Sequence, residues 1–182
     1  MPLRSGFGVS LLLSSALAVP PAFAQGPQGH PGNAPAAAPP SAYLIPIGAT
    51  ITLEQARKVA AAVQAEAHKN HWLMAIAVVD PAGTLVYYEK ADNTQDGSAN
   101  VALNKARSAA LYKRPTKAFQ DGLEKGGVNL RILALEGAVP VEGGLPLLVD
   151  GKLVGAVGVS GDLSENDGKC AAAGVAALGA HP

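Results

Sequence analysis

Residues Val141–Gly174 read VEGGLPLLVDGKLVGAVGVSGDLSENDGKCAAAG, and this stretch decides the fold class. Two runs rich in leucine and valine, Leu145–Val149 and Leu153–Val159, stand on either side of Asp150-Gly151. An Asp-Gly pair supplies the positive φ angles of a type I′ turn, the tight turn that matches the twist of paired strands. The stretch therefore predicts a β-hairpin, and its almost wholly apolar arms indicate strands covered on both faces.

A predicted helix follows the hairpin. Ser164 and Asp167 have the spacing of a capping box, in which the two side chains bind free amides of the first helical turn. We expect the helix to run to about Leu178. Cys170, the single cysteine, lies within this helix, so the chain forms no intrachain disulfide and we expect a packed rather than a reactive thiol.

A second hairpin and several helices are predicted upstream. Thr52 and Gln55 form a capping-box pattern at the start of a helix that fades near Asn70, a residue that tolerates the left-handed conformation of a helix end. The other predicted elements are strands at Leu73–Val79 and Thr84–Glu89, helices at Ser98–Lys113 and Thr116–Lys125, and a segment at Leu130–Leu135 that fits a strand or a short helix. Because both hairpins are antiparallel and strands do not alternate with helices, we predict an α+β domain with helices covering an antiparallel sheet.

The first 24 residues have the pattern of a bacterial secretory signal peptide. Arg4 supplies the positive start, Val9–Val19 the apolar centre and Ala22-Phe23-Ala24 the cleavage site. The apolar run is too short for a spanning helix, although an uncleaved N-terminal anchor is the alternative. We therefore expect a periplasmic or secreted protein with no integral membrane span after signal cleavage.

Composition divides the rest of the chain. Residues 25–46 are rich in Pro, Gly and Ala and predict a disordered linker, whereas residues 47–182 have the length of one domain. The chain has 14 basic and 14 acidic residues, so removal of Arg4 with the signal leaves 13 basic against 14 acidic residues, a net charge of −1. This balance argues against nucleic acid and against a charged membrane surface as partners.

Four groups of short motifs occur in a characteristic order and spacing. They are Ala75-Ile76-Ala77-Val78-Val79-Asp80 with Gly83, Lys105-Ala106-Arg107-Ser108-Ala109, Gly143-Gly144-Leu145-Pro146, and Gly158-Val159-Ser160-Gly161 followed by Asp167. With them the chain resembles the GlcG/HbpS family, the haem-binding and haem-degrading-like domain that is also fused to some cobalamin adenosyltransferases. The resemblance covers about Thr52 to Gly179.

The resemblance implies a profilin-like fold with a central antiparallel sheet flanked by helices, homo-oligomers, and haem binding in several members. Haem iron needs an axial donor, and His68, His71 and Met74 lie near the first predicted strand. For both histidines a surface role at the helix end is the alternative. Lys105 and Arg107 are candidate partners of the haem propionates; we expect the stem of Lys105 to pack while its ammonium reaches a polar rim, and a solvated helix face is the alternative for Arg107.

Glycine-rich turns supply a second set of candidates. The candidate anion- or ligand-binding residues are Gly143, Gly144, Ser160 and Gly161. Ser160-Gly161 precedes a helix whose free amides can hold a carboxylate or phosphate, unless the helix cap already uses them. No metal ligands are assigned, because the loop carboxylates Asp80, Glu89, Asp92 and Asp96 fit a solvated surface better than a cation site.

Two functions from different classes remain open. The first is an exported haem (tetrapyrrole)-binding protein that captures or buffers haem, with haem as the possible cofactor and oligomer surfaces supplying part of the site. The second is a non-haem small-molecule sensor or accessory module that binds an organic acid at the glycine-rich turns. None of the patterns HExxH, CxxC, CxxCH or GxSxG occurs, so we do not expect an enzyme. Oxidative haem breakdown and a purely structural oligomer are the remaining alternatives.

Overall fold

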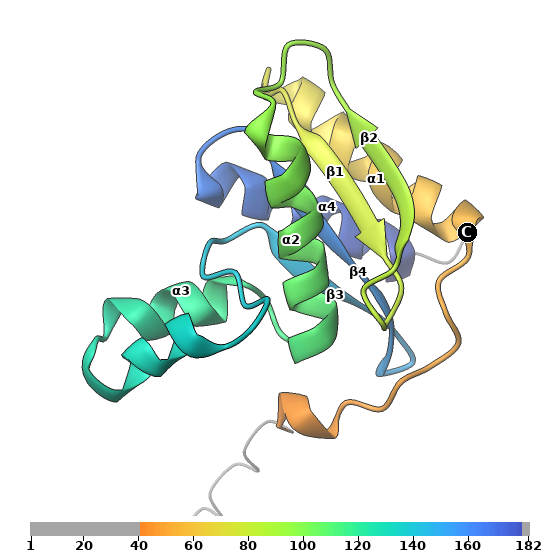
Figure 1. The fold of residues 1–182 in the computed structure, drawn as a ribbon. Coiled ribbons are helices and arrows are strands. Elements are labelled where there is room, and N and C mark those ends of the chain that lie inside the picture. Colours follow the sequence, from red (N-terminus) through yellow and green to blue (C-terminus); the bar gives the residue numbers. More distant parts are fainter. Residues whose placement is uncertain (1–40, 180–182) are drawn as a thin grey trace, which may run out of the picture. The chain divides into compact units, whose positions relative to one another are not determined.

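An antiparallel sheet of four strands lies at the centre of residues 41–179, the part of the chain that the computed structural model describes (Figure 1). The elements are, in chain order, η1 (Ala42–Leu44), α1 (Leu53–Lys69), β1 (Ala75–Val79), β2 (Leu85–Lys90), α2 (Gly97–Tyr112), α3 (Lys117–Glu124), η2 (Gly127–Ala134), β3 (Gly144–Val149), β4 (Lys152–Ser160) and α4 (Ser164–Gly179). The strand order is β2-β1-β4-β3, and each neighbouring pair is antiparallel. The predicted α+β class with a flanked antiparallel sheet is confirmed.

Residues 1–24, the predicted signal peptide, and residues 25–40 of the predicted linker lie outside the described residues. Within residues 41–179 no helix is long and apolar enough to cross a membrane. Packing begins before residue 47, the predicted start of the domain, because the Pro46 carbonyl accepts a hydrogen bond from the Leu153 amide at 2.8 Å. The end of the predicted linker therefore joins the domain.

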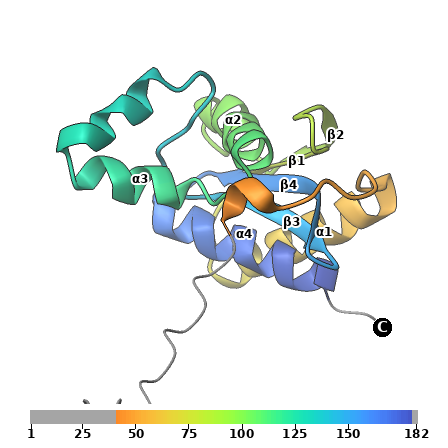
Figure 2. The same cartoon turned by 90° about the horizontal axis from the view of Figure 1, so that it is seen from below.

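Helices cover both faces of the sheet (Figure 2). α1 and α4 lie on one face, over a core of larger aliphatic side chains that includes Val59, Val63, Ile76, Leu147 and Val157. α2 covers the other face, where alanines meet alanines. A Cβ atom at Gly158 of β4 would overlap the backbone of Ala102 and Ala106, so α2 lies directly on the strand.

The predicted hairpin is formed by β3 and β4. Asp150 and Gly151 have φ angles of 49° and 72°, the left-handed pair that a type I′ turn requires. Residues Leu153–Ser160 of β4 are all buried, as expected for a strand covered on both faces. β3 differs from that expectation because it is an edge strand, and its Leu148 is 41% exposed.

The prediction for the start of α1 is confirmed, and the prediction for its end is off by one residue. The capping box is confirmed, since the Thr52 hydroxyl accepts the Gln55 N–H at 3.2 Å and the Gln55 side chain accepts the Thr52 N–H at 2.9 Å. The left-handed residue at the other end is His71, with φ 60°, and not Asn70, with φ −104°. Asn70 stays in the helical turn because its side-chain amide donates to the Glu66 carbonyl at 2.7 Å.

The predicted capping box of α4 is wrong. The Ser164 hydroxyl contacts the Glu165 carboxylate at 3.4 Å, and the Leu163 carbonyl accepts the Asp167 N–H at 3.0 Å. The Asp167 carboxylate does not fold back onto Ser164, because it turns into the interior and meets Lys105. In place of the predicted pairing with Ser164, the Asp167 carboxylate makes a long-range ion pair and accepts the Asp162 N–H.

The ambiguous segment Leu130–Leu135 falls almost wholly within η2, a 3₁₀ helix, and is not a strand. None of the η2 residues is buried. With α3, η2 projects from the side of the domain (Figure 1). The apolar residues of this segment therefore lie at the surface, and the segment does not pair with a strand of the sheet.

A buried ion pair between Lys105 and Asp167 joins three elements. Lys105 is 1% exposed, and its Nζ donates to Asp167 Oδ2 at 2.7 Å and to the Val159 carbonyl at 3.1 Å. The other carboxylate oxygen of Asp167 accepts the Asp162 N–H at 3.2 Å. Burial raises the pKa of Asp167, and the hydrogen bond and charge of Lys105 oppose that rise. The pair ties α2 to β4 and α4.

Replacement of Lys105 by Met should lower the free energy of unfolding by about 3–5 kcal/mol, because it leaves a buried carboxylate without its partner. Without Lys105, burial would raise the pKa of Asp167 further in the folded variant, so its carboxyl would keep a proton there. In the unfolded chain the same carboxyl loses its proton above its ordinary pKa. The loss should therefore be larger at pH 8 than at pH 5. Urea denaturation at both pH values measures it.

The matched control is Lys117→Met, which breaks the exposed pair between Lys117 and Asp121. Its cost should stay within about 1 kcal/mol. A Lys105→Met variant as stable as this control would contradict the importance of the buried pair. The double variant Lys105→Met with Asp167→Leu should recover part of the loss.

Cys170 lies fully buried on α4 as a free thiol, as predicted. Burial raises the pKa of the Cys170 thiol from an ordinary 9.0 to about 12. The reactive thiolate is therefore scarce at neutral pH, and water-borne reagents do not reach the sulfur.

Native protein should leave the disulfide reagent DTNB unreacted at pH 8, and one thiol should react per chain in guanidinium chloride. Between pH 9 and 12 the folded state keeps a thiol proton that the unfolded chain loses, so stability should fall as the pH rises through this window. Cys170→Ala should show a shallower fall. Rapid labelling of the native protein at pH 8 would overturn this prediction.

Candidate functional site

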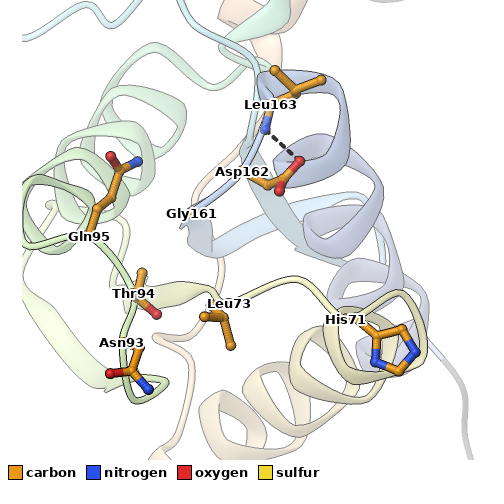
Figure 3. Close-up of a pocket in the computed structure, with 8 residues that line it drawn as sticks. All are labelled: His71, Leu73, Asn93, Thr94, Gln95, Gly161, Asp162 and Leu163. Atoms are coloured by element: carbon orange, nitrogen blue, oxygen red, sulfur yellow. Dashed lines mark hydrogen bonds between the residues drawn. The ribbon is translucent and has the colours of Figure 1, made fainter.

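A groove of about 500 Å³ opens where β1 begins and β4 ends (Figure 3). Ala75 at the start of β1 lies opposite Ser160 at the end of β4, so the segments flanking these strands meet here. The loop between β2 and α2 supplies another wall. The lining residues are His71, Leu73, Asn93, Thr94, Gln95, Gly161, Asp162 and Leu163.

Backbone geometry holds His71 and Gly161 at the groove. His71 is exposed and occupies the left-handed position after α1. A Cβ atom at Gly161 would overlap the Leu73 carbonyl oxygen, so only glycine lets the turn after β4 pass this close to Leu73. In Figure 3, Leu73 lies between Thr94 and His71. Leu73 thus gives the groove an apolar side chain, and His71 stands at one edge with its ring turned away from the other labelled side chains (Figure 3).

Asp162 gives the groove a fixed negative charge. Its Oδ1 accepts the Asn166 side-chain amide at 2.6 Å and the Leu163 N–H at 2.8 Å. These hydrogen bonds, the one from Asn166 above all, hold the pKa of Asp162 below its ordinary value. At neutral pH the groove therefore offers one imidazole, one carboxylate and the apolar surface of two leucines.

His68 lies beside this groove and Met74 lies beneath it. His68 is exposed and lines an adjoining hollow, which shares Leu73 and Asn93 with the groove. Met74 is 2% exposed and belongs to the core. Of the three predicted axial donors, the structure places the two histidines at the surface and one of them, His71, in the groove.

Lys105 is 1% exposed, so the expectation that its ammonium reaches a polar rim is wrong. The ammonium is buried against Asp167, because that carboxylate is itself buried and needs a counter-charge. Gly143 and Gly144 are packed against the same lysine. A Cβ atom at Gly143 would lie 2.8 Å from Lys105 Nζ, and one at Gly144 would overlap the Lys105 carbonyl. The space beside these two glycines is filled by the protein itself.

Ser160 and Gly161, the two residues of the other predicted anion-binding loop, differ in their exposure. Ser160 is buried and its hydroxyl contacts that of Ser98 at 3.3 Å, whereas Gly161 lines the groove. The first amide ahead of α4, that of Leu163, already donates to Asp162. Gly161 is thus brought together with His71, and Ser160 is not.

Arg107 lies away from the groove. It is exposed on α2, and its Nε donates to the Gly83 carbonyl at 3.2 Å in the turn between β1 and β2. That turn follows the end of β1, whereas the groove lies at its beginning. Arg107 instead lines another cavity with Leu85 and Leu111.

The sequence did not single out the loop Asn93–Gln95 or Asp162 and Leu163 as site residues. Asp162 and Leu163 reach the groove through pairing of β1 with β4, which no local pattern reveals, and the loop Asn93–Gln95 reaches it through pairing of β1 with β2. Among them only Leu163 is apolar, and its 70% exposure, which marks it as a surface contact, is known only from the structure. No group of three or more His, Cys, Asp or Glu within residues 41–179 could hold a metal ion.

Comparison with known proteins places this geometry in a family. The family model described as haem degrading protein HbpS-like matches residues 51–176, more than half of the chain. Protein GlcG of Escherichia coli K12 is 37% identical over 110 residues, which cover 60% of this chain and 81% of GlcG.

Two solved structures share the fold. A double mutant of HbpS from Streptomyces reticuli has a TM-score of 0.67 at 29% identity, covering 82% of this chain and all of that one. A structure described as a PduOC:haem complex has a TM-score of 0.65 at 25% identity, covering 70% of this chain and 94% of that one. The sequence match and the shared fold agree, and the chain belongs to the HbpS-like family.

Proposed function

We propose that this protein binds haem and captures or buffers it outside the cytoplasm. The observation that carries the proposal is the similarity to the PduOC domain, which was solved in complex with haem and which this chain matches over 94% of that domain's length. The groove at the start of β1 supports the proposal, because it combines an exposed imidazole with exposed leucines.

The residues of the groove fit the chemistry of haem. Haem, when bound, supplies an iron that accepts an imidazole nitrogen as axial ligand. His71 offers that nitrogen at the surface, and its backbone is fixed by the turn after α1. Leu73 and Leu163 present apolar surface to a ring. The carboxylate of Asp162 would repel the propionates, so they would face away from it.

Titration of the protein with haemin should give a saturable shift of the Soret band at micromolar concentrations. His71→Ala should weaken binding at least about tenfold and change the band position, because the iron loses its protein nitrogen. His68→Ala is the matched control and should bind haemin nearly as the wild type does.

The absence of a saturable shift in the wild type would sink the proposal. If haemin binding were lost only in His68→Ala, the iron ligand would instead be His68, in the adjoining hollow.

Export is part of the same proposal, since a haem buffer outside the cytoplasm must leave it. The support is the signal pattern of residues 1–24. Expression of the full chain in a bacterium should yield a periplasmic protein, and mass spectrometry should show that its chain starts at Gln25. Ala24→Asp, which spoils the cleavage site, should retain the signal. A wild-type protein that keeps Met1–Ala24 would speak against a cleaved signal. The homo-oligomer implied by the family resemblance stays a prediction.

A further inference from the structure

A second cavity, of about 630 Å³, lies between η1 and the projecting pair of α3 and η2. Figure 2 shows η1 next to the start of the α3 segment. The lining residues are Tyr43, Arg114, Ala118, Phe119, Gly122, Asn129, Arg131, Ile132, Ala134 and Leu135. The Ile132 side chain packs against the Gly122 backbone, where a Cβ atom would lie 2.6 Å from Ile132 Cδ1, and this contact between η2 and α3 forms one wall.

Two arginines give this cavity a positive charge. Arg114 lies between two aromatic rings, with its Cζ 4.8 Å from the centre of the Tyr43 ring and 5.5 Å from that of Phe119. Its Nε donates to the Tyr112 carbonyl at 3.0 Å, which fixes the guanidinium. Within residues 41–179, neither Arg114 nor Arg131 forms an ion pair with a carboxylate.

The rest of the lining is apolar or neutral. None of the ten lining residues is acidic, in contrast to the groove at His71, where Asp162 stands. Phe119, Ile132 and Leu135 supply aromatic and aliphatic walls. The Tyr43 phenol reports the positive field, because a hydrogen bond with Arg114 and then the charges of Arg114 and Arg131 hold its pKa below the ordinary value.

We propose that this cavity binds an aromatic carboxylate, with the carboxylate between Arg114 and Arg131 and the ring against Phe119. A guanidinium matches a carboxylate in geometry and charge, and two of them without acidic partners leave a charge that a ligand can neutralise. An apolar cavity with a few convergent polar groups is the usual form of a small-molecule site. The cavity includes Tyr43, which precedes residue 51 where the family match begins, so this site goes beyond the proposed haem groove.

Isothermal titration calorimetry with 2-naphthoate at low ionic strength tests the proposal. Saturable one-site binding is expected, and the neutral analogue 2-naphthalenemethanol should bind at least about tenfold more weakly, since it lacks the charge that the guanidiniums select. Equal binding of the two compounds would overturn the proposal, because an apolar patch would then explain it.

Two variants locate the ligand. Arg131→Gln removes one exposed guanidinium and should weaken naphthoate binding about tenfold. Ala118→Phe keeps both arginines but places a ring into the cavity, and it should abolish binding. Circular dichroism checks that both variants fold. Unchanged affinity in either folded variant would contradict the placement of the ligand.

Two controls separate this cavity from other sites. Arg57→Gln removes an exposed arginine of α1 outside the cavity, and naphthoate affinity should stay the same. His71→Ala should also keep it, because His71 lines the other site. Loss of binding in Arg57→Gln would reveal a nonspecific charge effect, and loss in His71→Ala would place naphthoate in the groove; either result would overturn the proposal.

Discussion

The buried contact between Lys105 and Asp167 is the constraint on which the rest of the structure depends. Two opposite charges buried away from water are stable only when they pair with each other, and here Lys105 Nζ lies 2.7 Å from Asp167 Oδ2. The ammonium also donates a hydrogen bond to the Val159 carbonyl. The contact explains why the Asp167 carboxylate turns into the interior, while its other oxygen still accepts the Asp162 N–H ahead of α4. Gly143 lies beside the pair with a φ of 126°, and a Cβ atom there would lie 2.7 Å from the Val159 carbonyl oxygen and 2.8 Å from the ammonium. One interaction thus holds α2 together with β4 and α4, which lie far from it in the sequence.

Local chemistry was enough to predict most of the fold. The Asp150-Gly151 turn and the Thr52 cap each depend on neighbouring residues, and each is found where the pattern placed it. The failures have non-local causes. Ser164 and Asp167 have capping-box spacing, but Asp167 finds a stronger partner 62 residues earlier. Leu130–Leu135 could be assigned to no single class because its exposed 3₁₀ helix leaves no regular burial pattern.

The candidate site was predicted only in part, for the same reason. His71 and Gly161 could be selected from residue type and position after a helix and a strand. Their meeting at one groove depends on the register of β1 with β4, which the sequence does not display. Lys105 was the least predictable residue. Its place on an apolar helix face predicted that the aliphatic part of its side chain packs, but only the fold shows that the ammonium is buried as well. The stacking of Arg114 on Tyr43 joins residues 71 positions apart and has no local signal.

The close approach of α2 to β4 at Gly158 has a consequence for how distant parts of the domain communicate. Backbone lies on backbone there, so no layer of side chains can change rotamer to let the helix slide or tilt. The histidine groove lies beside the loop that enters α2, and the arginine cavity begins just after the helix ends. A helix of 16 residues spans about 24 Å. α2 therefore acts as a rigid spacer, and adaptation of either pocket to its ligand falls to the loops and to the α3–η2 projection.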